Sequence, residues 1–348
     1  MANYINFQPN DFFKSINYTG TGAAQDVAVG FKPDFTWIKN RTAAGEGHHL
    51  YDAVRGVEKR LRTDTNASES TVATGLTTFG TDGFTVGSNA GVNGNGNGIV
   101  AWNWKAGTTS GLATNGSTTQ TPTAYSFSQA TGVSIIKYTG GGSAGNKFAH
   151  GLGVAPQMVL VKHTTATEDW CSYHIAMGNG KFLIINSLAA AGTNSNRWNN
   201  TTADAVNVTL GAAGEVNGQN AAYIAYCFAP VRGYSTMGQY SGNAAVNGQF
   251  INCGFKPAFI MIKNFDASEQ WNILYDLAPG YNPTDEKLNP SANNAQSQSS
   301  TFNIQFCANG FKINGNSTEI NGSNQGHVYL AFAKEPYVSS NSKAATAR

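Results

Sequence analysis

Residues that could perform chemistry are sparse in this chain, because only 12% of its 348 residues are charged. A glycosidase needs two carboxylates about 5–10 Å apart in one cleft. The 20 acidic residues are instead scattered along the sequence. No GxSxG stretch marks a nucleophilic serine at a strand-to-helix turn. The sequence therefore predicts a protein that is not an enzyme and that uses no cofactor.

The candidates for a metal site are His48 and His49, with Asp52 nearby. Adjacent residues of a strand point to opposite faces, so two neighbouring histidines chelate one ion poorly. No cysteine lies in a CxxC pair or at a metal-type spacing from histidine. We expect no metal site, and we expect buried free thiols, with a disulfide left open. The cysteines concerned are Cys171, Cys227, Cys253 and Cys307.

Two kinds of residue are candidates for contact with a partner. The strongest charge cluster, at residues 54–70, contains Arg60 and Arg62 and could touch an acidic partner, although a solvated face is the more common explanation. Aromatic residues in polar stretches, such as Trp198, could form platforms on which a glycan stacks, although aromatic residues more often fill a core. We take Trp198, Arg60 and Arg62 as the candidate contact residues.

A recurring lysine is the most conspicuous feature of the sequence. The stretch GFKPDFTWIKN at residues 30–40 returns as GFKPAFIMIKN at residues 254–264, and a third copy keeps only the proline and the lysine. In each copy the lysine follows the proline by six residues. The three pairs are Pro33 and Lys39, Pro156 and Lys162, and Pro257 and Lys263.

We interpret this motif as structural. A proline at the head of a strand loses only a donor at the sheet margin. The lysine is expected to emerge at the strand end, with its stem over apolar surface and its ammonium group in water. The alternative, that each lysine binds an anionic ligand, stays open.

Other markers recur in the same order around these lysines. A strand ends in a tyrosine turn before each copy, and an Asn-Gly turn precedes an aromatic strand after it. Constant order and spacing indicate internal repeats. The tyrosines are Tyr18, Tyr138 and Tyr240, and the asparagines are Asn93, Asn217 and Asn321.

The sequence therefore predicts an all-β protein made of three homologous antiparallel β-sandwich-like repeat domains, because short alternating runs are separated by Gly and Asn turns. A helical turn or two could form within residues 49–62. The repeat domains are residues 12–107, 133–233 and 234–336. An N-terminal segment (1–11), a Thr/Ser/Gly-rich linker (108–132) and a C-terminal tail (337–348) complete the chain.

Charge and hydropathy limit the partners that the sequence predicts. The net charge is +2, which argues against bulk attraction to nucleic acid or to an acidic membrane. No apolar run approaches the roughly 18 residues of a membrane span, and no secretory signal peptide is visible. We expect neither nucleic acid nor membrane as a partner.

The first unit resembles a repeat domain of unknown function in virion structural proteins of tailed bacteriophages, which are often tail-fibre-like and common in marine phages. The resemblance depends on NFQPNDFF, NYTGTG, VGFKPDFTWIKNR, HHLYDAVRG, DGFTVGS and IVAWNWKAG in that order. It covers residues 5–107 well and 234–336 moderately. The second unit departs most, because it lacks the Phe-Lys before its proline and the DGF strand. The resemblance implies a component of the phage particle, and it transfers no catalytic residue.

We therefore expect a virion structural protein that is assembled in the host cytoplasm and exposed on the particle. A tail-associated fibre or host-recognition protein, trimeric and in contact with other virion proteins and a host surface glycan or protein, is the first hypothesis. A capsid-decorating protein is the alternative, and a polysaccharide depolymerase is the third. Function is expected in the segments that do not repeat: residues 41–76, 164–202 and 281–302.

Overall fold

Short antiparallel strands are the main regular elements of the structure, a computed structural model that describes residues 5–280 and 282–336. All the pairings between named strands are antiparallel, and helices are confined to single turns. The prediction of an all-β, sandwich-like fold is confirmed. The predicted tail lies outside the described residues.

The first unit packs two sheets against each other, with strand orders β1-β9-β3-β4-β5-β6 and β2-β8-β7. The turn η1 (Pro9–Asp11) precedes it. Its elements are β1 (Phe13–Thr19), β2 (Gln25–Ala28), β3 (Phe35–Asn40), β4 (His48–Asp52), β5 (Gly56–Arg62), β6 (Ser70–Thr71), β7 (Leu76–Phe79), β8 (Gly83–Val86), α1 (Ala90–Asn93) and β9 (Gly98–Trp104).

The second unit has the orders β10-β11-β18-β13-β14-β15-β16 and β12-β17. Its elements are β10 (Ala124–Ser128), β11 (Val133–Thr139), β12 (Lys147–Ala149), β13 (Met158–His163), β14 (Cys171–His174), η2 (Ile175–Met177), β15 (Lys181–Ile184), β16 (Gly192–Thr193), α2 (Ser195–Trp198), β17 (Asn207–Thr209), α3 (Gly214–Asn217) and β18 (Ala222–Phe228).

The third unit has the orders β19-β27-β21-β22 and β20-β26-β25, with a small ladder β23-β24 beside them. Its elements are β19 (Ser235–Ser241), β20 (Phe250–Asn252), β21 (Phe255–Asn264), β22 (Trp271–Tyr275), β23 (Glu286–Lys287), β24 (Ser297–Gln298), β25 (Ile304–Cys307), β26 (Gly310–Ile313), α4 (Thr318–Asn321) and β27 (Gly326–Pro336).

The larger sheets of the three units share one strand order, in which the opening strand pairs with the closing strand and the closing strand pairs with the proline–lysine strand. The marker residues make the same contacts each time. Tyr18, Tyr138 and Tyr240 donate to the carbonyls of Val92, Val216 and Ile320 at 2.6, 2.6 and 2.7 Å. Common descent of the three units stays a prediction, which this recurrence supports.

The marker asparagines fasten each closing turn to the opening strand. Asn93 Oδ1 accepts from Thr21 N at 2.8 Å, and its Nδ2 donates to Gly87 O at 2.8 Å. Asn217 and Asn321 bond in the same way. A glycine is required opposite this turn, because a Cβ on Gly20 would lie 2.2 Å from Gly94 O.

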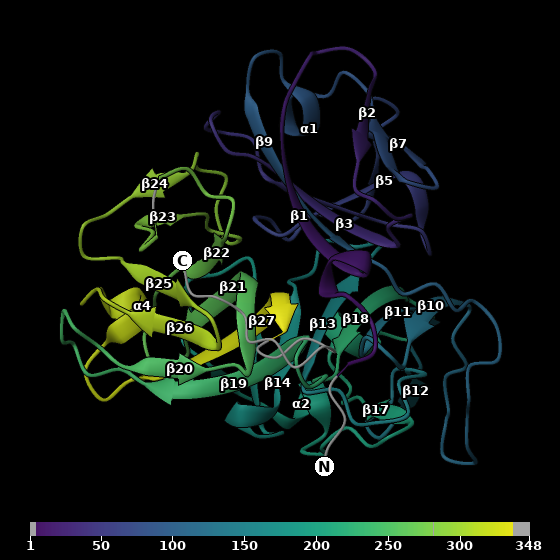
Figure 1. Cartoon of the computed structure of the whole chain (residues 1–348). Helices are drawn as coiled ribbons and strands as arrows, with labels where there is room; N and C mark the ends of the chain where they lie inside the picture. The colour runs from purple at the N-terminus through teal and green to yellow at the C-terminus, as the bar shows by residue number, and fades with distance from the viewer. Residues whose placement is uncertain (1–4, 281, 337–348) are drawn as a thin grey trace.

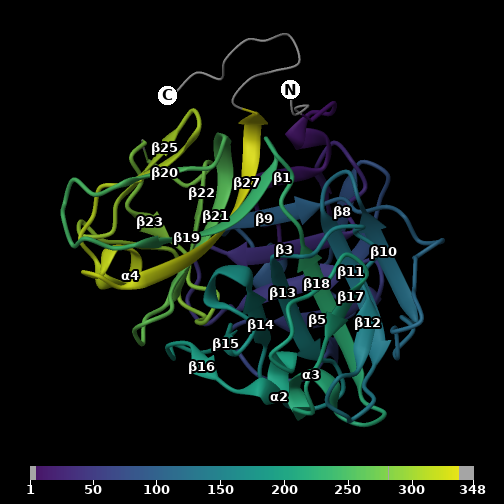
Figure 2. The ribbon, with the colours of Figure 1, turned by 90° about the horizontal axis from the view of Figure 1, so that it is seen from below.

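Figure 1 shows the three units as three lobes around one centre. The largest core cluster draws on all three units, whereas the other three clusters each lie within one unit. Rings from different units meet at the centre, where Trp104 and Phe228 lie 5.6 and 5.9 Å from Phe332 between ring centroids. The units therefore form a closed ring around a shared aromatic core. In Figure 2, η1 and the end of β27 lie at the same edge.

The structure corrects three local expectations. Residues 49–62 form strands β4 and β5 instead of a helical turn. The segment expected as a linker contributes β10, which pairs with β11 at the edge of the second sheet. Pro33 and Pro156 precede β3 and β13 as predicted, but Pro257 lies inside β21, where the register shifts on both sides of it.

Candidate functional site

The three recurring lysines are buried, which contradicts the prediction that their ammonium groups reach water. Lys39, Lys162 and Lys263 are each 0% exposed. Lys39 Nζ donates to Asn40 O at 2.6 Å and to Glu46 O at 2.7 Å. The other two likewise donate to backbone carbonyls, among them Glu168 O for Lys162 at 2.6 Å. A neighbouring unit packs over two of these strand ends, since Lys162 also donates to Asn66 O of the first unit and Lys263 to Leu188 O of the second.

Burial lowers the pKa of each of the three lysines from 10.5 to about 8, because a low-dielectric site disfavours the charged form. Nearby carboxylates act in the opposite direction, such as Asp64 on Lys39 and Glu168 on Lys162. Backbone carbonyl oxygens take the place of water around each ammonium group.

The segments in which function was expected join the units to one another. Residue 69 of the first unit donates its backbone N–H to Thr164 O of the second at 2.9 Å. Ala191 of the second unit bonds in the same way to Phe265 O of the third at 2.8 Å, and Gln296 of the third bonds to Arg41 O of the first at 2.7 Å. Each acceptor follows a recurring lysine by two residues. The contacts therefore run in a cycle around the ring.

Side chains reinforce the same cycle. Lys162 Nζ donates to Asn66 O of the first unit at 3.0 Å, and Lys263 Nζ donates to Leu188 O of the second at 3.1 Å. Trp170 Nε1 donates to Arg62 O of the first unit at 2.7 Å. Segments 41–76, 164–202 and 281–302 are thus clasps between units, and much of their polar backbone is used inside the molecule.

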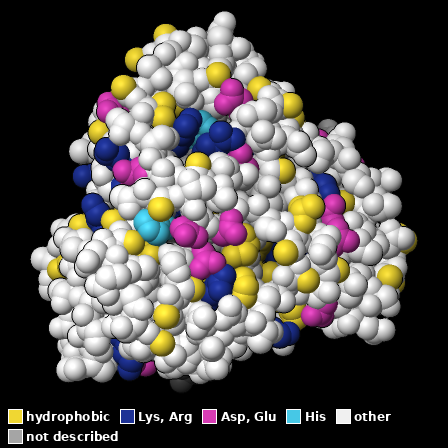
Figure 3. Space-filling model, turned by 180° about the vertical axis from the view of Figure 1, so that it is seen from behind, with side chains coloured by type: hydrophobic (Ala, Val, Ile, Leu, Met, Phe, Trp, Pro, Cys, Tyr) yellow, Lys and Arg dark blue, Asp and Glu magenta, His cyan; other side chains and the backbone are white. Residues whose placement is uncertain are grey.

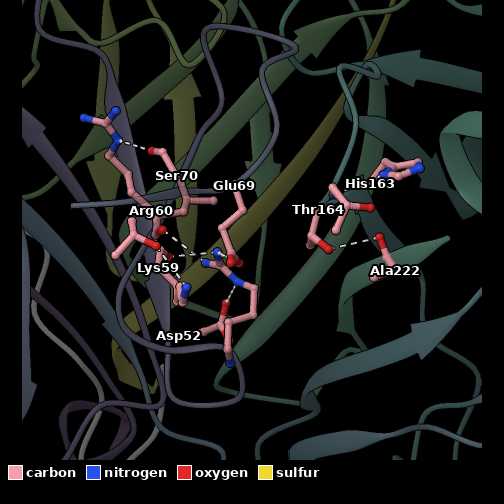
Figure 4. Close-up of polar contacts among 12 residues, drawn as sticks. Asp52, Lys59, Arg60, Glu69, Ser70, His163, Thr164 and Ala222 are labelled. Atoms are coloured by element: carbon pink, nitrogen blue, oxygen red, sulfur yellow. Dashed lines mark hydrogen bonds and ion pairs between the residues drawn. The ribbon is translucent and has the colours of Figure 1, made fainter. Parts of the chain in front are cut away.

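A buried charge network lies where the first clasp meets the second unit (Figure 4). Arg55 Nε lies 2.6 Å from Asp52 Oδ2, and the two side chains are 2% and 0% exposed. Tyr226 of the second unit donates its hydroxyl to the same oxygen at 2.6 Å, and Glu69 lies 3.0 Å from Arg55. Burial opposes the charge of Arg55, but Asp52, Tyr226 and Glu69 raise its pKa. Asp52 therefore serves as a buried hydrogen-bonding and ion-pairing residue between two units.

An open polar cavity of about 380 Å³ lies on the outer side of the same clasp. Arg60 donates from Nε to Ser70 Oγ at 3.2 Å, and Arg62 donates from Nε to Asp64 Oδ1 at 3.1 Å. Figure 4 shows Arg60 pointing away from the Asp52 network. Asn293, from the third unit, closes the cavity. The full lining is Arg60, Arg62, Asp64, Thr65, Ala67, Ser68, Ser70 and Asn293.

A model of a domain of unknown function, DUF7483, matches residues 8–336, which include all three units. The chain belongs to the DUF7483 family. No curated protein is similar to it. No helix in the described part of this DUF7483 chain is long and apolar enough to cross a membrane.

The prediction that Trp198 of this DUF7483 chain contacts a partner is wrong. It is 1% exposed and lies 5.8 Å from Tyr173, ring to ring, in the core of the second unit. His48 and His49 are neighbours on β4, and His48 accepts from Trp37 Nε1 at 2.9 Å. No group of three or more potential metal ligands occurs among the residues that the structure describes. The predicted free thiols are confirmed, with two cysteines buried and two half-buried.

Sequence reasoning missed two features of the site. In the Asp52–Arg55–Tyr226 network, Asp52 and Tyr226 are 174 positions apart, and no local sequence pattern predicts a contact between them. The cyclic clasps did leave a signal, because each segment that does not repeat lies between the proline–lysine strand and the closing strand of its unit. We read that variation as a sign of external function, whereas each segment fits a different neighbouring unit.

Proposed function

We propose that this chain is a non-enzymatic structural protein on the surface of a bacteriophage particle, and that it belongs to the tail and serves in host recognition. The motif resemblance of the first unit supports the phage assignment. The observation that carries the structural role is the closed ring: its buried lysines and its Asp52–Arg55 pair hold segments of different units together. These charged side chains, which could otherwise take part in catalysis, hold the three units of the chain together.

A tail location suits this architecture because three lobes point away from one centre, while η1 and the end of β27 meet at one edge. The first and last described elements, η1 and β27, lie in contact. The ring could therefore join other virion proteins at that edge and present its lobes to a cell surface.

A capsid-decorating role is the second candidate, favoured by the triangular outline in Figure 3. Three similar lobes around one centre suit a threefold position on a capsid lattice. Electron microscopy of the phage particle, with the chain labelled by an antibody fragment, decides between the two. Density on the tail is the expected result, and density repeated over the capsid lattice would overturn the tail assignment.

The trimer expected from the sequence belongs to the same proposal. Analytical ultracentrifugation should give three times the mass of one chain, and a single-chain mass would show that one three-unit chain does the work of a trimer. Release of reducing ends from host capsular polysaccharide by the purified protein would contradict the non-enzymatic assignment and favour a depolymerase.

A further inference from the structure

The three units differ in charge at the second position of the single-turn helix that precedes each closing strand. In the second unit this helix carries Glu215, which pairs with Arg197. In the third unit it carries Glu319, whose Oε1 accepts from Lys287 Nζ at 2.6 Å. The first unit has Gly91 at this place in its helix. A carboxylate that neutralises a clasp cation in two units is therefore missing from the first.

The strand beside the clasp shows the same difference. Leu61, Leu183 and Leu288 occupy one register position in the three units, since they pair with Leu50, Ser172 and Ile273. The residues just before these leucines are Arg60, Phe182 and Lys287. Phe182 lies under the guanidinium of Arg197 at 4.5 Å, and Lys287 is paired with Glu319. Arg60 has neither a ring beneath its guanidinium nor a paired acid among residues 5–280 and 282–336.

A side chain cannot fill the vacant helix position in the first unit. A Cβ on Gly91 would lie 2.3 Å from Cε1 of His49 and 2.8 Å from Oε2 of Glu46, and these two side chains occupy that space. A helix acid is therefore excluded by packing, and the carboxylate of Glu46, from the loop before β4, lies beside Gly91 in its place. The cavity thus holds two arginines against one carboxylate, Asp64.

Arg60 keeps most of its hydrogen-bonding capacity for a ligand. Its Nε donates to Ser70 Oγ, and its terminal nitrogens donate to no oxygen within the described residues. A free guanidinium fork matches a carboxylate, sulfate or phosphate with two parallel hydrogen bonds. Hydroxyl groups of Thr65, Ser68 and Ser70 and the amide of Asn293 line the rest of the cavity.

We propose that this cavity binds an anionic saccharide, with Arg60 as the anchor for its carboxylate, sulfate or phosphate group. The proposal rests on the host-recognition function proposed above and names the class of its ligand. A volume of about 380 Å³ lies within the range of about 300–1,000 Å³ typical of small-molecule sites and has room for a single sugar residue. Hydroxyl and amide groups around one cationic anchor complement the hydroxyls of a sugar ring.

Nucleic acid fits the cavity less well. Backbone recognition needs a row of cations that follows successive phosphates. Here one arginine is free and the other is held by Asp64, and the chain as a whole carries a net charge of only +2.

Isothermal titration calorimetry on the full chain tests the site. The probes are trigalacturonate, a sulfated disaccharide, glucose 6-phosphate, neutral maltotriose and a short single-stranded DNA. At least one anionic saccharide should bind, with maltotriose and DNA at least ~10-fold weaker. Because a charge-assisted hydrogen bond contributes about 1.5–3 kcal/mol, Arg60→Gln should lower the affinity by about 10–100-fold. The order of the anionic probes identifies the bound group.

Three variants separate a built site from general charge. Lys32→Gln removes one positive charge from an exposed position of the same unit and should leave binding unchanged. Arg60→Lys keeps the charge but not the fork, and should recover only part of the affinity. Ser68→Glu places a carboxylate in the cavity and should abolish binding. Equal urea midpoints for all variants confirm that each one folds.

Several results would overturn the proposal: no binding of any anionic saccharide, equal losses for Arg60→Gln and Lys32→Gln, or DNA that binds as tightly as the saccharides. Its failure is distinguishable from failure of the proposed function. If microscopy finds no copy of the chain on the particle while Arg60-dependent binding persists, the virion role falls and the site stands. If the chain is on the tail but binds no anionic saccharide, the site falls and the virion role stands.

Discussion

The surroundings of Lys39 and the cavity around Arg60 lie in the same unit, but the positive charge is buried and hydrogen-bonded in the first and open to the cavity in the second. Lys39 is fully buried, and backbone carbonyls of its own unit accept from its ammonium group. Arg60 lies on the outer side of the neighbouring clasp and bonds through one nitrogen to Ser70. The lysine recurs in all three units, whereas the arginine has a phenylalanine and a paired lysine as its counterparts.

This difference shows where each unit is constrained by its neighbours and where it is free to change. A buried cation must keep its hydrogen-bond partners, because an unsatisfied charged group in the interior is costly. This requirement explains why a lysine is found at the same position of each unit. An outer position carries no such requirement, and the first unit has a cavity there in place of an internal ion pair.

The largest effect is expected from breaking the buried pair. Asp52→Asn leaves Arg55, at 2% exposure, with Glu69 as its remaining carboxylate. Removing one partner of a buried ion pair costs about 3–5 kcal/mol. Urea denaturation of the purified protein should show a loss of this size in the free energy of unfolding. Asp82→Asn, at an exposed position, is the control, and equal stability of the two variants would contradict the structural role of the network.

The next largest loss of stability is expected where one of the recurring lysines bonds to a neighbouring unit. Lys162→Met keeps the stem but removes the ammonium group from Asn66 O and Glu168 O. A buried acceptor left without a donor costs about 1–3 kcal/mol, so we expect a loss of about 2 kcal/mol in urea denaturation. Lys32→Met, at an exposed site, should stay within about 0.5 kcal/mol of the parent. A Lys162→Met variant as stable as Lys32→Met would show that the hydrogen bonds of Lys162 contribute nothing to the stability of the fold.

The role of the lysines also changes the meaning of an attachment experiment. If they are scaffold residues, replacing all three by Gln should leave attachment to a target intact in a protein that still folds. Burial makes loss of folding the expected first effect of the triple variant, so single substitutions are the informative ones.

The sequence predicted the fold well because its alternating runs and Asn-Gly turns are local. It also located Tyr18, Asn93 and their counterparts, which make one recurring set of bonds. It did not predict the burial of Lys162, because the covering carbonyl belongs to Asn66, 96 residues earlier. A contact of that range depends on how the units pack.

At the candidate site the structure separates two of the predicted contact residues: contact by Arg60 stays a prediction, and contact by Trp198 is wrong. Arg60 belongs to a cluster of charges, and charge favours the surface. Trp198 stands in an equally polar stretch, but it ends α2 and its indole turns into the core of the second unit. The polar neighbours of an aromatic residue therefore do not decide which way its ring points.

The buried lysines also predict how stability depends on pH. The pKa of each is 10.5 when unfolded and about 8 when folded, so the unfolded chain binds more protons between these values. Stability therefore rises with pH from about 8, by up to about 1.4 kcal/mol per pH unit for each lysine. Burial raises the pKa of Cys171 and Cys227 in the folded protein, which opposes this rise above the ordinary thiol value of 9.0.

Urea midpoints measured from pH 7.5 to 9 should show this rise. Lys162→Met removes one of the three titrating groups, so its stability should rise less steeply than that of the parent. Parallel curves for the two proteins would show that Lys162 does not titrate in this range.

The smallest change in stability is expected for Arg60. Comparing it with its counterpart Lys287 tests most directly whether Arg60 differs from the charged residues that hold the units together. Lys287→Gln breaks a half-buried pair and leaves Glu319 without its cation, so it should cost about 1 kcal/mol. Arg60→Gln removes a side chain that pairs with no acid in the described part of the chain, and it should change the free energy of unfolding by less than about 0.5 kcal/mol. Urea denaturation of the two variants side by side gives the difference. A cost for Arg60→Gln as large as that for Lys287→Gln would mean that Arg60 serves stability and is not held free for a ligand.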